Sequence, residues 1–281
     1  MNFLSLKLSG VKRLRWLCGL SFFLGVTCLS QPVWAQRKVH RGGAFWPELQ
    51  AEYVLKSTSY FYLRNHYRHN WDNDFNYLRP EGFLKYLERA QIRAGYEHVF
   101  NAHWSGGISE SYAFEGTRNL WFNEVFARHI GAIGRFRLTK RAYLEHNVQT
   151  NQDDRARFRF RTDLERDFKI RKKAIRPRIG YELFFNHYYD AGINEARNTR
   201  QVDRSRLRLE LTYSIDKHLA FTPYLMRQTD FITTLASFDV NGNELQPGGK
   251  QNTITPVFGI DIRYVFYQGG TPFSRVIRSN K

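Results

Sequence analysis

The sequence is poor in cysteine, with only Cys18 and Cys28 among its 281 residues. Both precede residue 36, so the rest of the chain can form neither a disulfide framework nor a cysteine metal site. After residue 35, no stretch approaches the roughly 18 continuous apolar residues of a transmembrane helix, which excludes a helical membrane protein. The metalloprotease, nucleophile-elbow, dinucleotide and phosphate-loop motifs are also missing. The sequence therefore predicts no catalytic, metal or cofactor residues.

The first 35 residues have the organisation of a secretory signal peptide. Basic residues between Lys7 and Arg15 precede an apolar run from Leu17 to Leu29. Small residues at Val33 and Ala35 then mark a cleavage site before Gln36. We therefore expect residues 1–35 to be removed; an uncleaved membrane anchor is the alternative.

The sequence has far fewer acidic than basic residues, 26 against 43, which gives a formal net charge of +17. A basic balance favours nucleic acid, anionic lipid or an anionic solute as partner. Because we expect the chain to be exported, nucleic acid is excluded as a physiological partner. The expected partners are outer-membrane lipid, the barrel-assembly machinery and an anionic solute. The oligomeric state is not predicted.

From residue 44 onward, the sequence alternates with a period of two, which is the pattern of β-strands. Between 157 and 165, Arg, Asp and Glu alternate with Phe, Thr and Leu, and similar patterns recur at 178–186, 204–215 and 258–266. Less regular segments lie at 45–55, 58–68, 84–97, 103–113, 119–131, 135–147 and 217–235. These segments number 11, but bacterial single-chain barrels have an even number of strands. We therefore expect an all-β fold in which residues 36–267 form a single antiparallel barrel of 10–12 strands, with 12 favoured, followed by a tail at 268–281.

The alternation permits two orientations of the faces. In a soluble barrel the apolar face would form the core, whereas in a membrane barrel it would contact lipid. The predicted strands run about 10 to 13 residues, which suits a membrane span better than the usual soluble strand. Several apolar faces also end in aromatic residues, where a membrane girdle would lie. The sequence thus predicts a barrel in the outer membrane of a Gram-negative bacterium, with lipid-facing side chains that include Phe158, Leu183, Leu209 and Ile260.

The opposite face of the strongest strands carries the charges and would line the lumen. Arginine pairs with carboxylates in a fixed fork geometry, and opposite charges on neighbouring strands lie close enough to pair. The predicted lumen network is Glu145, Arg157, Arg159, Arg161, Asp163, Glu165, Arg178, Glu182, Arg204, Arg206, Arg208 and Glu210.

Three functions fit such a barrel. The favoured one is a structural barrel whose lumen is filled by these ion pairs. The first alternative is a narrow, porin-like channel that prefers anions, because rings of arginine can select them. The second alternative is a lipid hydrolase that uses Ser111 and His146 near one rim.

Three segments carry a family resemblance. The runs Arg155–Arg161, Arg178–Phe184 and Arg204–Tyr213 resemble an uncharacterised, domain-of-unknown-function family of bacterial outer-membrane β-barrels. The resemblance covers about residues 45–267. It implies a barrel fold and an outer-membrane location, and it supplies no catalytic residues. One departure is that Phe266 and Tyr267 are followed by 14 further residues, whereas many outer-membrane barrels end on an aromatic residue.

Overall fold

The computed structural model describes residues 37–55, 59–71, 86–115, 118–149, 152–170, 173–188, 202–234, 236–242, 244–246 and 248–267. The chain divides into two units, Met1–Gln36 and Arg37–Lys281. The predicted signal peptide, its cleavage site between Ala35 and Gln36, and the predicted tail 268–281 all lie outside the described residues. Within the described ranges, no helix is long and apolar enough to cross a membrane.

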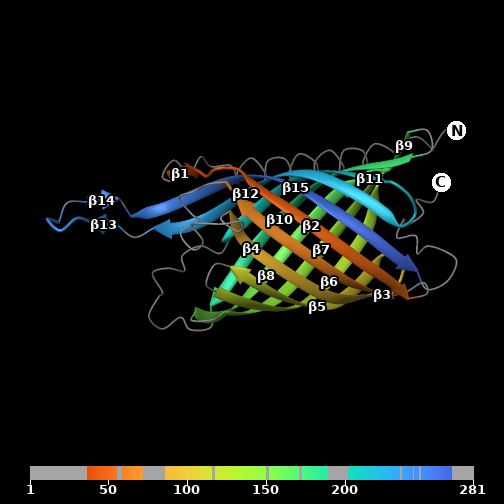
Figure 1. Cartoon of the computed structure of the whole chain (residues 1–281), viewed down its shortest axis with the longest axis horizontal. Helices are drawn as coiled ribbons and strands as arrows, with labels where there is room; N and C mark the ends of the chain where they lie inside the picture. Colours follow the sequence, from red (N-terminus) through yellow and green to blue (C-terminus); the bar gives the residue numbers. More distant parts are fainter. Residues whose placement is uncertain are drawn as a thin grey trace, which may run out of the picture. The chain divides into compact units, whose positions relative to one another are not determined.

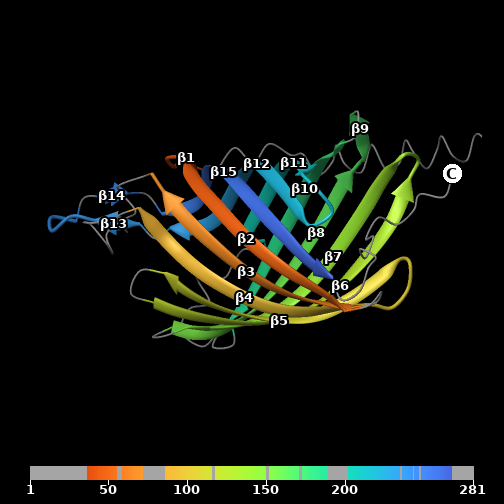
Figure 2. The same cartoon turned by 45° about the vertical axis from the view of Figure 1, so that its right-hand side comes forward.

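Among the described residues, 11 strands form a closed all-β barrel (Figures 1 and 2). Long period-two stretches explain these strands, because each can bury one face and expose the other. The barrel strands are β2 (Ala44–Leu55), β3 (Ser59–Asn70), β4 (Leu87–Val99), β5 (Trp104–Glu115), β6 (Arg118–Ile133), β7 (Phe136–Gln149), β8 (Gln152–Glu165), β10 (Lys173–Tyr188), β11 (Arg204–Ser214), β12 (Leu219–Thr234) and β15 (Gly249–Tyr267).

Four short strands add to the barrel. β1 (Arg37–His40) pairs with β15 in parallel, and β9 (Phe168–Ile170) pairs with β10. β13 (Ser237–Phe238) and β14 (Glu244–Gln246) form a separate two-stranded sheet within the connection from β12 to β15.

The closure of the barrel corrects two expectations. Consecutive barrel strands from β2 to β15 pair antiparallel, but β15 closes on β2 in parallel, from Val257 opposite Ala44 to Tyr267 opposite Val54. The expected purely antiparallel barrel is therefore wrong at this seam, and the favoured count of 12 strands is replaced by 11. The two corrections have one cause. In a ring of alternating strand directions, an odd number leaves the first and last strands pointing the same way.

Proline at position 47 does not break β2. The ladder between β2 and β3 passes from Phe45 opposite His69 to Glu48 opposite His66. Trp46 and Pro47 are thus absent from that register, so the missing N–H of proline removes no bond from it. The predicted segment 45–55 is therefore a full strand of the barrel.

The two faces of the barrel wall carry different kinds of side chain. Outward side chains are apolar and exposed; the exposed fraction is 51% for Leu209 and 43% for Phe158. Leu183 and Ile260 point to the same side and are half-buried. Charged side chains such as Glu182 and Glu210 are buried on the inward face. Apolar faces outside and charged faces inside are the arrangement of a barrel that sits in lipid.

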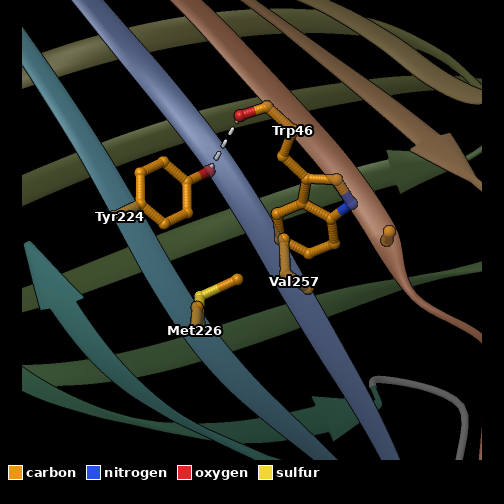
Figure 3. Packing of buried hydrophobic residues seen from close by; sticks show 5 residues of the cluster. Trp46, Tyr224, Met226 and Val257 are labelled. Atoms are coloured by element: carbon orange, nitrogen blue, oxygen red, sulfur yellow. Dashed lines mark hydrogen bonds between the residues drawn. The ribbon is translucent and has the colours of Figure 1, made fainter.

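An apolar cluster fastens the parallel seam (Figure 3). Trp46 of β2, Val257 of β15 and Tyr224 of β12 pack together inside the barrel, with Ala44 and Met226 beside them. The Tyr224 hydroxyl donates a hydrogen bond of 3.0 Å to the backbone carbonyl of Trp46. Because β15 lies between β12 and β2, this bond ties the two strands that flank β15.

Candidate functional site: the charged lumen

The twelve charged residues predicted for the lumen lie on four neighbouring strands, β7, β8, β10 and β11. Each of them makes at least one ion pair with an oppositely charged side chain. The register explains this. β8 and β10 place Arg178 opposite Glu165 and Glu182 opposite Arg161, and β11 places Glu210 opposite Arg178.

Glu210 is the most heavily paired carboxylate of the network. It accepts hydrogen bonds from Arg161 at 3.0 Å and from Arg178 at 2.9 Å, and it forms an ion pair with Arg208, whose Nε lies 2.7 Å away. Arg178 continues to Glu165 at 2.8 Å. A carboxylate has two oxygens with about four acceptor positions, so one glutamate can serve three guanidinium groups. These contacts form a continuous chain of ion pairs across three strands.

A second group of pairs centres on Arg159 of β8. Its guanidinium contacts Glu124 and lies 3.4 Å from Glu182 and 3.7 Å from Glu145. It also stacks over the ring of Tyr143, with 4.3 Å between the guanidinium carbon and the ring centroid. Several carboxylates thus share one arginine, and the stack adds a cation–π contact in a buried setting.

The sequence did not reveal the part of the network on β4, β5 and β6. Glu124 contacts Arg159 and accepts from Arg93 at 3.3 Å, while Glu97 pairs with Arg128. On these strands, inward charges are interspersed with small residues such as Ser109, so no run of alternating charge marks them. Their register relative to the arginine-rich strands was the missing information.

The lumen contains a cavity of about 360 Å³ with a strong excess of positive charge. Its lining holds 13 arginines against 4 glutamates. All four glutamates form ion pairs with arginines of the lining: Glu48 with Arg64, Glu115 with Arg89, Glu145 with Arg157 and Arg159, and Glu182 with Arg159 and Arg206. The cavity lies toward the end of the barrel at which β2 begins, since it includes Arg68, Arg89 and Arg204 near that end.

Arg68 is the most distinctive residue of the cavity. Its side chain is buried and stacks over Trp46, with 4.4 Å between the guanidinium carbon and the ring centroid. Its Nε has no acceptor, and within the described part of the chain Arg68 makes no ion pair. Arg206 lies over the ring of Trp46 at 5.4 Å, and the His66 ring meets Trp46 edge-on at 5.6 Å.

The charged residues named at the other end of the lumen are paired with one another or with neighbouring arginines. Asp163, Glu165, Arg178 and Glu210 do not line the cavity and lie nearer the end at which β2 finishes. Each has at least one ion-pair partner. The lumen therefore has an arginine-rich cavity toward one end and a group of ion-paired side chains toward the other.

The structure does not bring Ser111 and His146 together. Ser111 points inward and its hydroxyl accepts a hydrogen bond from Arg93 at 3.0 Å. His146 lies on the outward face of β7, where it contacts Asp154 at 3.5 Å. In the described part of the chain, no cluster of His, Cys, Asp and Glu is arranged to hold a metal ion.

The comparison with protein families identifies the chain. A family model described as "Protein of unknown function (DUF2490)" matches residues 43–237, which cover the barrel strands from β2 to β12. The chain belongs to this family. The match confirms the resemblance to an uncharacterised family that the arginine-patterned strands indicated.

Solved structures similar to this DUF2490 member include two barrels. "LpxR from Salmonella typhimurium" has a TM-score of 0.43 and 11% identity, covering 77% of this chain and 87% of that chain. A "NanC porin" structure has a TM-score of 0.40 and 10% identity, covering 79% of this chain and 97% of that chain. No curated protein matches the DUF2490 sequence.

Proposed function

We propose that this protein is an outer-membrane β-barrel whose lumen binds small anions with more than one negative charge. The observation that carries the proposal is the cavity lined by 13 arginines and 4 glutamates. Nine of these arginines form ion pairs with carboxylates, but Arg68 and Arg141 form none in the described part of the chain. Burying such unpaired cations is costly, and an anion bound beside them offsets that cost. Arginine is suited to this role because its planar fork matches the oxygens of phosphate and carboxylate groups.

Arg68 is the expected anchor of the anion. Its guanidinium is buried over the Trp46 ring, with 4.4 Å between the guanidinium carbon and the ring centroid, so little side-chain freedom is lost when it binds an anion. Its Nε has no acceptor within the chain. Arg206 on the same ring supplies a second positive group. We expect both guanidinium groups to contact the bound anion.

The wall supports the membrane location. The barrel strands contain between 11 and 19 residues, and a tilted membrane strand needs about 9 to 11. The outward side chains are apolar, and Trp104, Trp121 and Phe266 are among the exposed aromatics. Cleavage of residues 1–35 remains the prediction on which export depends.

Binding is tested with inorganic pyrophosphate and the protein refolded in detergent. We expect wild type to bind pyrophosphate in calorimetry and Arg68→Gln to bind about tenfold more weakly, the loss of one charge-assisted hydrogen bond. Arg227→Gln is the matched control, because Arg227 is exposed on the outward face of β12. Equal affinity of wild type and Arg68→Gln would contradict the proposal.

A narrow, anion-preferring channel is the second candidate, favoured by the same excess of arginine. Planar-bilayer recordings decide between holding and conducting an anion. A steady current with an anion-selective reversal potential supports the channel. No current together with pyrophosphate binding supports a closed, anion-binding barrel. If the protein shows neither current nor pyrophosphate binding, the result supports a structural barrel whose lumen is filled by ion pairs. The ion pairs of Glu210 with Arg161 and Arg178 favour that function.

A further inference from the structure

The outward face of the barrel has a groove that is separate from the cavity in the lumen. A hollow of about 990 Å³ crosses the outward face of the barrel from β2 to β7. Its lining is mainly apolar, with Phe61, Ile108, Val125 and Leu144 among the exposed side chains. Ala94 of β4 leaves it open, because the small side chain lies between larger neighbours.

A row of polar side chains crosses this apolar groove. The strand register places Glu110 of β5 opposite Asn123 of β6, and Asn123 opposite His146 of β7. All three residues line the groove and point outward. Glu110 is exposed and has no hydrogen bond or ion pair within the described part of the chain. Charged groups on the lipid side of a barrel are costly, so those present call for a partner.

Neighbouring aromatic residues indicate how deep in the membrane this polar row would lie. Tyr112 and Phe114 follow Glu110 on the outward face of β5, and Tyr112 packs edge-on against Trp121 at 5.7 Å. The Trp121 indole N–H donates to Asn123 at 3.1 Å. Aromatic clusters of this kind mark the interface between headgroups and acyl chains. The row thus lies just inside the interface, at the level where acyl chains are linked to the rest of a lipid.

We propose that the groove binds a membrane lipid whose acyl linkages carry amide or hydroxyl groups. This proposal rests on the proposed membrane location of the barrel. A carboxylate accepts hydrogen bonds and donates none. Ester linkages offer only acceptors, so they cannot satisfy Glu110, whereas an amide N–H or a hydroxyl can. The apolar part of the groove, from Ile108 toward Phe61, then receives the acyl chain.

Two lipids with the same headgroup isolate this chemistry. Sphingomyelin and phosphatidylcholine both carry phosphocholine, but only sphingomyelin has an amide and a hydroxyl at its linkage. Native mass spectrometry of the protein, refolded in detergent and mixed with each lipid, counts the bound molecules. We expect wild type to retain sphingomyelin about tenfold better, the value of one hydrogen bond to a charged group.

Two variants test the groove itself. Glu110→Leu should bind both lipids equally, because the acceptor is removed while the groove remains. Ala94→Phe should lose both lipids, because the ring fills the hollow. Ala127→Phe is its matched control, since Ala127 is exposed on the outward face of β6 but does not line the groove.

Three results would overturn the proposal: equal retention of the two lipids by wild type, unchanged selectivity in Glu110→Leu, or a protein dimer that occupies the groove in place of lipid. Membrane location fails separately, if the protein produced in bacteria is recovered in the soluble fraction. Lipid selectivity in detergent does not depend on that fractionation, so the two failures are distinguishable.

Discussion

The Tyr224 hydroxyl donates to the backbone carbonyl of Trp46 at 3.0 Å, across the strand that separates β12 from β2. Gly259 on β15 lies beneath the Tyr224 ring, and a Cβ at that position would collide with it. The missing side chain therefore lets a tyrosine cross the strand and bind on the other side. One glycine and one hydroxyl fasten the seam at which the barrel closes.

Removing the Tyr224 hydroxyl should weaken the barrel modestly. Tyr224→Phe keeps the packing against Val257 and Met226 but loses the bond to Trp46. We expect a loss of about 1 kcal/mol in the free energy of unfolding, the net worth of one hydrogen bond. Urea unfolding in detergent measures it. An unchanged urea midpoint would show that this bond does not support the seam.

A side chain at position 259 should have a larger effect. Gly259→Val forces the Tyr224 ring out of its position, and such overpacking costs about 1 to 3 kcal/mol. Gly131→Ala is the control, because a Cβ there meets only the His129 ring at 3.4 Å, an ordinary contact. Similar urea midpoints for the two variants would contradict the role assigned to Gly259.

The orientation of the wall predicts the effect of charge at position 209. Leu209 is 51% exposed on the outward face of β11. Leu209→Arg should lower the free energy of unfolding in lipid by about 2 to 4 kcal/mol, the cost of a cation on the lipid side. Leu209→Phe should fold as wild type. Equal stability of the two variants in vesicles would mean that this face does not meet lipid.

Within the lumen, the stability of the barrel should be sensitive to the loss of the Glu124 carboxylate. It is buried, and it contacts Arg159, Arg93 and Ser109. Glu124→Gln leaves the arginines without their counter-charge, and breaking a buried pair costs about 3 to 5 kcal/mol.

The control for this change is an exposed pair. Asp167 has 40% of its side chain exposed and pairs with Arg176. Asp167→Asn should cost less than about 1 kcal/mol, because exposed pairs contribute little. Urea midpoints of both variants provide the comparison. A mild effect of Glu124→Gln would indicate a hydrated, screened lumen.

The signal peptide prediction is tested by mass. The basic segment, the apolar run and the Val33–Ala35 site predict cleavage between Ala35 and Gln36. Intact-mass measurement of protein extracted from outer membranes should give a chain that begins at Gln36. A mass that includes residues 1–35 would exclude cleavage.

The sequence was sufficient to predict which side chains point inward on the strands with the most regular alternation. Arginine and glutamate at every second position between 157 and 165 made the inward set unambiguous. Glu124 could not be found this way, because its partner Arg159 comes from another strand and only the register brings them together. The pairing of Ser111 with His146 failed for a related reason. A shift of one residue moves a side chain to the other face, and these two residues fall on opposite faces.

The strand count was the least predictable feature. Local alternation shows where strands lie, and it contains no information on how the first strand meets the last. Val257 and Ala44 are far apart in the sequence, and their parallel pairing depends on the whole ring. The expectation of an even number came from bacterial barrels in general, and it outweighed a residue pattern that gave 11.

The parallel seam also constrains the order of assembly. β2 is the first barrel strand to be synthesised and β15 is the last, so their ladder cannot form until all the barrel strands have been synthesised. Until then, every partly assembled wall has two unpaired edges that can join another chain. Pairings between residues so distant in sequence form slowly, because a large loop must close before any contact rewards it. The rate of closure at this seam should therefore set the time for which the growing barrel needs protection from aggregation.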